Sequence, residues 1–355
     1  MKILHVVTSL RTGGAEKLVT DLVPRFKKLG YHVDVAVFDG IETPFMERLK
    51  AQGSEVISLG KSMYSPIHIL RLRNLMKDYD IVHTHNTYPQ LYAAIANIFV
   101  KTKLITTEHS TNNRRRKYAI FRILDQWMYT QYNQVICISD KAYENLRDYI
   151  GQDERISVIY NGVDVEAFRN ALPISIKTSR KFVMVMVASF HWQKDQDTLI
   201  KALALLPKKQ FELWLVGDGN RRLVIEQLAT ELGVKDSVKF WGIRCDIAQI
   251  LHAADVTVMS SHFEGLSLSS IEGMSVGKPF VASDVDGLHE VVEGAGILFP
   301  HQDADALVKI LQKLRGDKEF YGVIASACYE RAKKYDIDNT VNSYESLYKY
   351  VLNYV

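Results

Sequence analysis

Short runs of apolar residues alternate along the first half of the chain with longer segments in which apolar residues recur every three or four positions. The short runs predict buried strands, and the longer segments predict amphipathic helices. The strand runs are KILHVVTSL, HVDVAVF, EVISLG, DIVHTHN, KLITTEH, QVICIS and ISVIYNG. The helical pattern is clearest in AEKLVTDLVPRFKKLG, with Gly30 as its expected end. Strands alternating with helices predict parallel pairing through right-handed crossovers, and hence a doubly wound sheet.

The alternation starts again after a polar, irregular stretch, NGVDVEAFRNALPISIKTSR. The runs KFVMVMVAS, FELWLVGDG, VKFWGI, DVTVMSS, KPFVASD and AGILFP predict a second parallel sheet. We therefore expect two Rossmann-like domains, residues 1–168 and 169–337, and a final helix at 338–355 that packs back on the first domain. Ligands of open α/β sheets bind beyond the carboxyl ends of the strands, so two such domains facing one another would enclose a central cleft.

Composition excludes several classes of protein. The 355 residues are 47% hydrophobic and 24% charged, which is typical of a folded protein with two domains. The net charge of +3 is too small to indicate nucleic-acid binding. The three cysteines are scattered without CxxC spacing and favour reduced thiols in the cytoplasm. No apolar stretch approaches the roughly 20 residues that span a bilayer, so we expect at most peripheral contact with the inner face of the cell membrane.

The stretch EGLSLSSIEGMSVGKP (264–279) contains the strongest candidates for a functional site. It follows a predicted strand, and a helix is expected from about Ser269 to Val276. The free amides and positive dipole at the start of such a helix bind phosphate. Glu264 would lie in the preceding loop, and Glu272, one turn inside the helix, could accept hydrogen bonds from a diol. The alternative is a solvated helix with ordinary surface acids.

Three further candidates follow other predicted strands. Gly13 and Gly14 of LRTGGAEKL allow the backbone to approach a ligand closely, although the dinucleotide pattern GxGxxG is absent. His109 of TEHS could donate to a sugar hydroxyl or to developing negative charge, or could simply be satisfied by nearby backbone. Lys194, near the start of a helix, could neutralise phosphate as a point charge, or could be an ordinary surface lysine.

Signals for a metal ion are weak. HTH (83–85) places two histidines on the same side of a strand but offers no obvious third ligand. DQD (195–197) and DVD (284–286) are expected to be acids of a first helical turn and of a loop turn. We therefore expect no metal site and no cofactor.

A basic run followed by an amphipathic pattern occupies NNRRRKYAIFRILDQWMYTQY (112–132). It predicts a helix whose residues Phe121, Leu124 and Met128 face the core and whose basic end is solvated. The alternative is a surface that contacts anionic lipid or an acceptor bearing pyrophosphate.

Taken together, these motifs resemble the retaining glycosyltransferases of family GT4, which have the GT-B fold. The motifs are GGAE, TEHS, YNGVD, Lys194, VGDG, WGIRCDI and EGLSLSSIEGMSVGKPFVASDVDGLHEVV. Their order and spacing carry the resemblance from about residue 3 to the last helix. The most specific part is the pair of glutamates seven residues apart followed by G-x-P.

The resemblance implies roles for the matching residues. Three would be catalytic: Glu264 and His109 beside the donor sugar, and Lys194 on the pyrophosphate. The residues that would bind the nucleotide-sugar donor are Gly14, Ile243, Arg244, Leu266, Ser267, Leu268 and Glu272. Among them, Glu272 would hold the ribose and Ile243 would read the base through its backbone. Members of this kind need no metal ion, because the lysine and the helix N-terminus stabilise the leaving diphosphate.

One position departs from the family pattern. An arginine commonly lies five residues before the lysine, and this chain has Ser189 there. A neutral hydroxyl cannot replace a bidentate cation on a diphosphate, and Arg244 could compensate for it.

We therefore expect a metal-independent, retaining glycosyltransferase. It would move a hexose or N-acetylhexosamine from a nucleotide-sugar, expected to be UDP-linked, to a glycan or lipid-linked acceptor in surface polysaccharide synthesis. One alternative is a non-catalytic partner that binds the nucleotide-sugar without turnover, as Ser189 would suggest. Another is an isomerase similar to UDP-N-acetylglucosamine 2-epimerase, which GGAE and the paired glutamates match less well.

Overall fold

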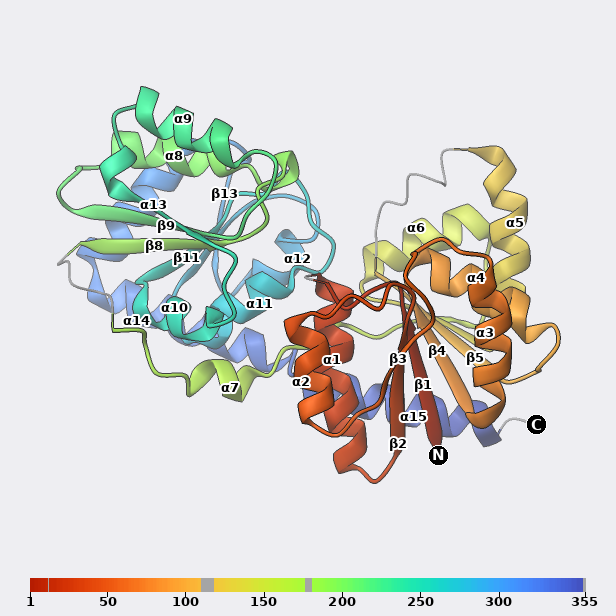
Figure 1. The fold of residues 1–355 in the computed structure, drawn as a ribbon. Helices are drawn as coiled ribbons and strands as arrows, with labels where there is room; N and C mark the ends of the chain where they lie inside the picture. The colour runs from red at the N-terminus through yellow and green to blue at the C-terminus, as the bar shows by residue number, and fades with distance from the viewer. Residues whose placement is uncertain (12, 110–117, 176–180, 354–355) are drawn as a thin grey trace. The chain divides into compact units, whose positions relative to one another are not determined.

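The computed structural model describes residues 1–11, 13–109, 118–175 and 181–353 (Figure 1). It divides into two compact units, Met1–Gly162 with Ile337–Val355, and Val163–Asp336. Each unit is an α/β domain built on a parallel sheet. The chain leaves the first unit at Gly162, and its last helix returns to that unit.

The first unit contains a seven-stranded sheet in the order β3-β2-β1-β4-β5-β6-β7. All its strand pairs are parallel. The strands are β1 (Lys2–Val7), β2 (His32–Val37), β3 (Val56–Ser58), β4 (Ile81–His85), β5 (Lys103–Glu108), β6 (Gln134–Cys137) and β7 (Ile156–Val158). The helices are α1 (Gly14–Lys28), α2 (Pro44–Ala51), α3 (Ile67–Leu75), α4 (Thr87–Asn97), α5 (Ala119–Thr130), α6 (Asp140–Ile150) and α15 (Ile337–Asn353), with a 3₁₀ turn η1 (Met76–Asp78).

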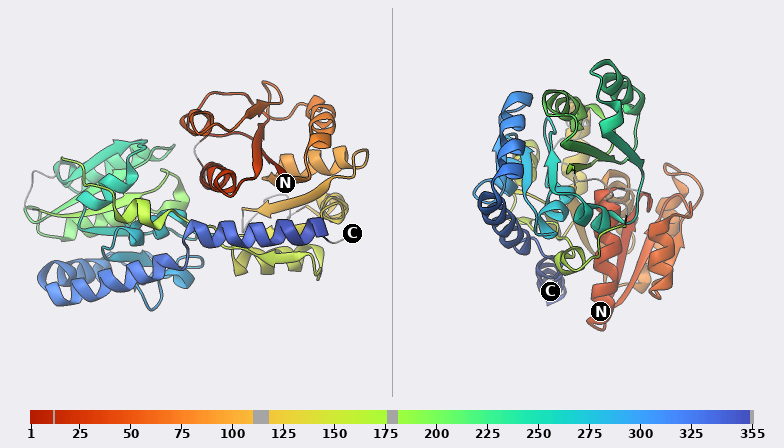
Figure 2. Two further views of the ribbon diagram at one scale, coloured as in Figure 1. Left: turned by 90° about the horizontal axis from the view of Figure 1, so that it is seen from below. Right: turned by 90° about the vertical axis from the view of Figure 1, so that its left-hand side faces the viewer.

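Hydrophobic residues cover both faces of this sheet, as doubly wound packing requires. Along β1, Ile3 and Val7 belong to one core cluster, and Leu4 and Val6 belong to another. Helix α15 lies along the first unit's sheet (Figure 2). It buries apolar and aromatic residues at helical spacing, namely Ile337, Val341, Tyr344, Tyr348 and Val351.

The second unit contains a six-stranded parallel sheet in the order β10-β9-β8-β11-β12-β13. The strands are β8 (Phe182–Val187), β9 (Phe211–Val216), β10 (Val238–Gly242), β11 (Val256–Met259), β12 (Phe280–Ser283) and β13 (Ile297–Phe299). The helices are α7 (Val165–Arg169), α8 (Gln196–Leu205), α9 (Arg222–Glu231), α10 (Ile247–Ala253), α11 (Leu268–Ser275), α12 (His289–Val292), α13 (Ala304–Gly316) and α14 (Lys318–Lys333), with 3₁₀ turns η3 (Trp192–Lys194) and η4 (Lys235–Ser237). Every predicted strand run contains a strand of the structure.

Helix α5 differs from its predicted packing. Met128 is buried, but Phe121 and Leu124 are 36% and 38% exposed, so the prediction that both face the core was wrong. Asp125 is buried instead, and its Oδ2 accepts a hydrogen bond of 3.0 Å from the hydroxyl of Tyr149. The basic residues before this helix lie within 110–117, outside the described residues.

Among the described residues, no helix combines the length and the hydropathy needed to cross a membrane.

Candidate functional site

Two neighbouring strands of the second unit bring Lys194 and Glu264 together. Lys194 follows β8, Glu264 follows β11, and these strands pair in parallel, so their carboxyl ends lie side by side. The Lys194 Nζ is 2.5 Å from the Glu264 Oε1, and the two side chains are 19% and 6% exposed. The hydroxyl of Ser261 donates to the same oxygen at 2.6 Å. The structure thus joins two predicted catalytic residues in one largely buried ion pair.

The backbone around Glu264 is held by a close approach of two loops. The Glu264 amide donates to the carbonyl of Asp286 at 3.0 Å. Next to it, Gly287 has a φ of +81°, and a Cβ there would lie 2.3 Å from the Glu264 carbonyl oxygen. A side chain at residue 287 would therefore be strained and would also clash with backbone.

Helix α11 follows directly and begins at Leu268, one residue before its predicted start. Ser267 caps it, because its hydroxyl accepts a hydrogen bond of 3.3 Å from the amide of Ser270. Leu266 and Leu268 are partly buried on either side of this cap. Glu272 lies one turn inside the helix and is only 5% exposed, which contradicts the alternative of a solvated helix with surface acids.

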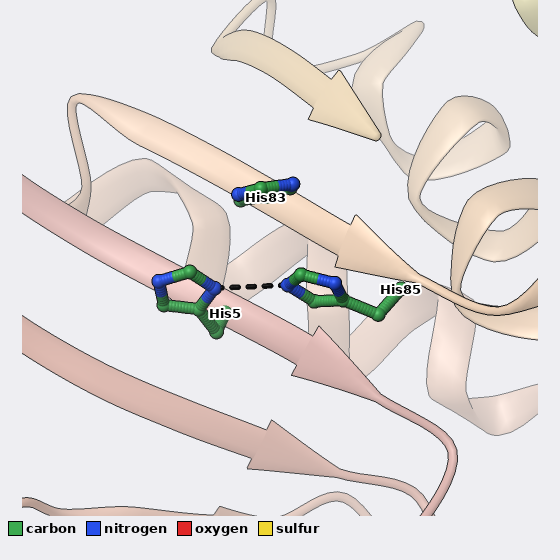
Figure 3. Close-up of side chains that lie close together, drawn as sticks. All are labelled: His5, His83 and His85. Atoms are coloured by element: carbon green, nitrogen blue, oxygen red, sulfur yellow. Dashed lines mark hydrogen bonds between the residues drawn. The ribbon is translucent and has the colours of Figure 1, made fainter. Parts of the chain in front are cut away.

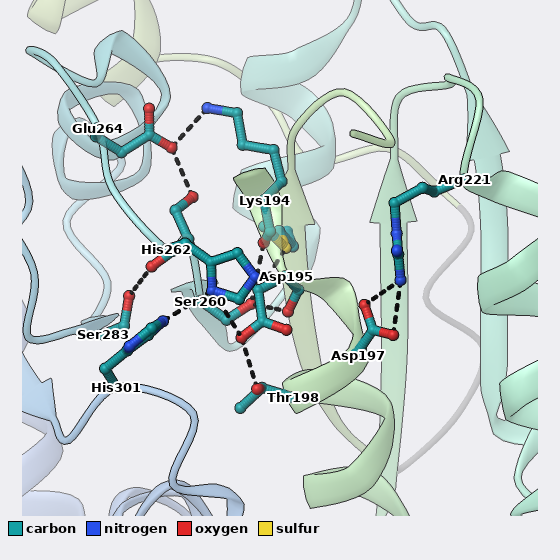
Figure 4. Close-up of polar contacts among 12 residues, drawn as sticks. Lys194, Asp195, Asp197, Thr198, Arg221, Ser260, His262, Glu264, Ser283 and His301 are labelled. Carbon is teal, nitrogen blue, oxygen red and sulfur yellow. Dashed lines mark hydrogen bonds and ion pairs between the residues drawn. The ribbon is translucent and has the colours of Figure 1, made fainter. Parts of the chain in front are cut away.

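More polar residues surround this pair than the sequence motifs suggested (Figure 4). Arg221, which follows β9, holds both carboxylate oxygens of Asp197 at 2.8 Å. Asp195 lies beside His262 and His301, which follow β11 and β13. Sequence reasoning missed Arg221 and both histidines, because each lies in a different loop and carries no motif.

Ile243 and Arg244 follow β10, at one edge of the sheet, where β9 separates them from β8. Ile243 is 68% exposed. Arg244 is paired with Asp246, its Nε and Nη2 lying 2.8 and 2.6 Å from the two carboxylate oxygens. Its guanidinium charge therefore already has a partner, and its compensation for Ser189 stays a prediction.

In the first unit, the candidate residues Gly14 and His109 follow β1 and β5, the two strands on either side of β4. Gly14 is the first residue of α1, and the preceding Gly13 is extended. A Cβ on Gly13 would lie 2.2 Å from a carboxylate oxygen of Glu16. That carboxylate also accepts a hydrogen bond of 3.3 Å from the side-chain Nδ2 of Asn86, which directly follows β4. Burial raises the pKa of Glu16.

His109, at the end of β5, belongs to a row of hydrogen-bonded histidines. Its Nε2 is 2.9 Å from the Nδ1 of His85, and the Nε2 of His85 is 3.0 Å from the Nδ1 of His5. Burial lowers the pKa of both His5 and His109 to about 3 and holds the pKa of His85 well below its ordinary value. The partner of His109 is thus a side chain and not the local backbone.

His83 lies beside this row (Figure 3). Its Nδ1 is 2.6 Å from the hydroxyl of Tyr348 in α15, and its Nε2 is 2.8 Å from the hydroxyl of Thr107. One nitrogen from each of His5, His83 and His85 lies within 4.8 Å of the others. His5 is therefore the third histidine that HTH lacked in the sequence, and parallel pairing of β1 with β4 supplies it.

Two sequence families match the two halves of the chain. Residues 12–167 match Glycosyltransferase Family 4, and residues 181–317 match Glycosyl transferases group 1. The chain belongs to glycosyltransferase family 4.

Similar proteins and the solved structures of other glycosyltransferases agree with this assignment. The chain is 27% identical to the putative glycosyltransferase EpsD of Bacillus subtilis (strain 168), over 91% of this chain and 90% of EpsD. It is also 27% identical to UDP-Gal:alpha-D-GlcNAc-diphosphoundecaprenol alpha-1,3-galactosyltransferase of Escherichia coli, over 82% of this chain and 80% of the relative. The crystal structure of Anabaena HepE in complex with UDP-glucose is 25% identical and superposes with a TM-score of 0.86, covering 98% of this chain and 100% of HepE. Both domains of the glycosyltransferase thus have the Rossmann-like architecture of the GT-B fold.

Proposed function

We propose that this glycosyltransferase moves a hexose or N-acetylhexosamine, with retention of configuration, from a UDP-sugar to a lipid-linked glycan during surface polysaccharide synthesis. The observation that carries the proposal is the buried Lys194–Glu264 pair beside the N-terminus of α11. The donor class is supported by HepE, which was solved with UDP-glucose. The acceptor class is supported by the E. coli relative, whose name gives a diphosphoundecaprenol acceptor.

The proposed chemistry concentrates on the leaving diphosphate. The Lys194 ammonium and the amides at Leu266, Ser267 and Leu268 would stabilise its growing negative charge, as preorganised donors do in other transferases. Because these groups supply the positive charge, we propose that transfer needs no metal ion.

The remaining predicted residues would hold the rest of the donor. Glu264 would accept a hydrogen bond from the donor sugar and Glu272 from the ribose, since a carboxylate can accept from two hydroxyls of a diol. Gly14 would approach a phosphate through its amide, and His109 would contact the sugar. Burial lowers the pKa of His109 to about 3, so it would act as a neutral hydrogen-bonding group and not as a cation.

The exposed face of α5 supports contact with a membrane that carries the acceptor. Ile123 is 75% exposed and Tyr118, just before the helix, is 63% exposed. Exposed apolar residues on an amphipathic helix favour insertion at a lipid surface.

Nucleotide release tests the proposal. The full-length protein is incubated with UDP-, GDP- and ADP-sugars, with and without a polyprenyl-diphosphate-linked glycan in detergent, and free nucleoside diphosphate is measured. We expect acceptor-dependent UDP release that persists in a chelator, and a product with the anomeric configuration of the donor by NMR. Binding without release would favour a non-catalytic partner, and interconversion of UDP-sugars without acceptor would favour an isomerase.

Variants test the assignment of residues. Lys194→Ala should lower turnover by roughly 100-fold or more, the typical loss when a transition-state donor is removed. Glu272→Ala should raise the KM for the donor. The matched control is Lys239→Ala, which breaks another pair between a lysine and a buried glutamate, Lys239–Glu212 at 2.8 Å, within the same unit. Equal losses in Lys194→Ala and Lys239→Ala would mean that Lys194 acts only on folding.

A further inference from the structure

We propose that Asp195, His262 and His301 form a binding site for Zn²⁺ or a similar transition-metal ion. The site belongs to the second unit alone and does not rest on the proposed donor or acceptor. It uses Asp195 without Asp197, so it is not the DQD arrangement, but it departs from the expectation that the chain has no metal site. Asp197 instead holds Arg221.

The three side chains already lie close to metal-binding geometry. The His262 Nδ1 is 2.8 Å from the His301 Nε2 and 3.9 Å from the Asp195 Oδ2, and one ligand atom from each residue lies within 4.8 Å of the others. Around a tetrahedral zinc ion with bonds near 2.0–2.1 Å, neighbouring ligand atoms lie about 3.3 Å apart. The separations of 2.8 and 3.9 Å lie on either side of that value.

The backbone presents these side chains from three loops at one end of the sheet (Figure 4). Asp195 follows β8 in a left-handed conformation with a φ of 46°, and its carbonyl accepts a hydrogen bond of 2.7 Å from the hydroxyl of Ser260. His262 follows β11, and its amide donates to the Gln193 carbonyl at 2.8 Å. The loops that carry two of the ligands are thus joined to each other before any ion binds.

Burial of the Asp195 carboxylate favours a cation beside it. Asp195 is 3% exposed, and its Oδ2 accepts a hydrogen bond of 2.7 Å from the hydroxyl of Thr198. A buried carboxylate is costly without a positive partner. The neighbouring Lys194 does not oppose a metal ion strongly, because its ammonium is paired with Glu264.

The two facing imidazole nitrogens point to the same conclusion. His262 and His301 approach each other through one nitrogen each, and a hydrogen bond between them needs a proton on only one of the two. If both nitrogens are deprotonated, their lone pairs face the same point, which is what a metal ion requires. The His262 side chain is 8% exposed and contacts Trp192 in a tilted arrangement, with ring centroids 4.3 Å apart. His301 is exposed and gives ions a route from solvent.

The ligand set selects the kind of metal. Two imidazoles and one carboxylate suit Zn²⁺, Co²⁺ or Ni²⁺, whereas Mg²⁺ and Ca²⁺ prefer sets of oxygen ligands. The other histidine group, His5, His83 and His85, is less suitable. All three residues are fully buried, none is a carboxylate, and both nitrogens of His83 already have hydrogen-bond partners.

Zinc binding to the full-length, untagged protein tests the proposal. Competition with a chromogenic zinc chelator should show about one tight site per chain, and Co²⁺ should give the visible absorption of a low-symmetry site. His301→Ala, which alters an exposed residue and should leave the fold intact, is expected to weaken zinc affinity by roughly 100-fold. Asp195→Asn should weaken it as well.

His289→Ala is the matched control. His289 is a partly exposed histidine of the same unit whose Nδ1 and Nε2 contact Asp284 and Glu293, so its two acids lie on opposite sides of the ring. This variant should bind zinc like the wild type. The proposal is overturned if the wild type shows no tight site, or if His301→Ala binds zinc as tightly as His289→Ala does. UDP release is measured separately, so loss of the zinc site and loss of the proposed transferase activity are distinguishable.

Discussion

Each unit has a cluster of buried polar side chains in or after its parallel strands, but the two clusters differ in charge. In the first unit, His5, His85 and His109 bond to one another, and burial keeps all three uncharged. In the second unit, Lys194 and Glu264 form an ion pair whose lysine is still 19% exposed. Parallel sheets of the same kind therefore support a neutral network in one domain and a charged network in the other.

Among the described residues, His83, beside the histidine row, also has only uncharged polar partners. Tyr344 and Tyr348 of α15 pack against His83, and their hydroxyls complete a network of neutral donors and acceptors with Thr107. Imidazoles suit such a place because each neutral ring is both donor and acceptor. A lysine or glutamate has no neutral form of comparable stability near pH 7 and needs an opposite charge when it is buried.

Acid should affect the first cluster most strongly. The folded-state pKa of His5 and His109 is lowered to about 3, while an unfolded histidine titrates near 6.5. Between these values the unfolded state binds protons that the folded state excludes, so the free energy of unfolding of the first unit should fall as the pH drops below about 6.5. The expected fall is about 1.4 kcal/mol per pH unit for each such histidine. Hydrogen exchange of peptides from β1 and β4 between about pH 7.5 and 5 would measure it, after correction for intrinsic exchange rates.

A variant separates this effect from general acid instability. His5→Leu removes one of the buried imidazoles and should reduce the pH dependence in the first unit by about 1.4 kcal/mol per pH unit. His191→Ala removes an exposed histidine of the second unit and should leave it unchanged. An equal pH dependence in His5→Leu and the wild type would show that His5 is not held neutral.

Removing one charge should have the next largest effect, and it should act on the second cluster. Glu264→Gln keeps the shape of the side chain but leaves Lys194 without its partner charge. Breaking a buried pair costs about 3 kcal/mol, and because Lys194 retains some contact with solvent the loss in unfolding free energy should not exceed this value. Urea unfolding and UDP release would be measured on the same sample. Wild-type turnover in this variant would exclude a role for the Glu264 charge in transfer.

Backbone geometry should have a smaller but distinct effect on that cluster. In Gly287→Ala, the new Cβ would clash with the Glu264 and Gly265 carbonyl oxygens, and the positive φ adds strain. We expect a loss of about 1–3 kcal/mol in stability together with lower turnover, because the loop that carries Glu264 must move.

Gly294→Ala is the control for backbone strain. Its φ of +72° is similar, but the nearest atom to the new Cβ is the end of the Arg331 side chain at 3.7 Å. It should lose stability through strain while keeping turnover, and equal turnover in the two variants would argue against a role for this loop in positioning Glu264.

The positions of strands and strand ends could be predicted because they depend on local periodicity. The run DVTVMSS is a strand, and Glu264, Ser267 and the start of α11 follow it as expected. Which strands lie side by side is a long-range property that periodicity does not encode. His5 and His85 are far apart in the chain and meet only because β1 pairs with β4. His262 and His301 meet only because β11 and β13 lie in the same parallel sheet and their carboxyl ends point the same way.

Helix α5 shows a second limit of sequence reasoning. Its apolar pattern predicted a buried face, yet Phe121 and Leu124 are exposed and Asp125 is buried. Hydrophobic spacing identifies a helix but does not say whether its apolar side meets the protein core or another partner. The hydroxyl of Tyr149 gives the buried Asp125 a partner, and that contact is not visible in the spacing.

The smallest expected effect concerns this exposed face of the first unit, in contrast to its buried histidines. Ile123→Ser alters a side chain that is 75% exposed, so unfolding free energy should change by less than about 0.5 kcal/mol. If the face enters a lipid surface, losing one isoleucine should weaken binding to anionic vesicles by about tenfold. Leu223→Ser, at a residue of the second unit that is 77% exposed, is the control for general surface hydrophobicity. Vesicle sedimentation would compare the two variants, and equal affinity in both would show that this face of α5 does not contact the membrane.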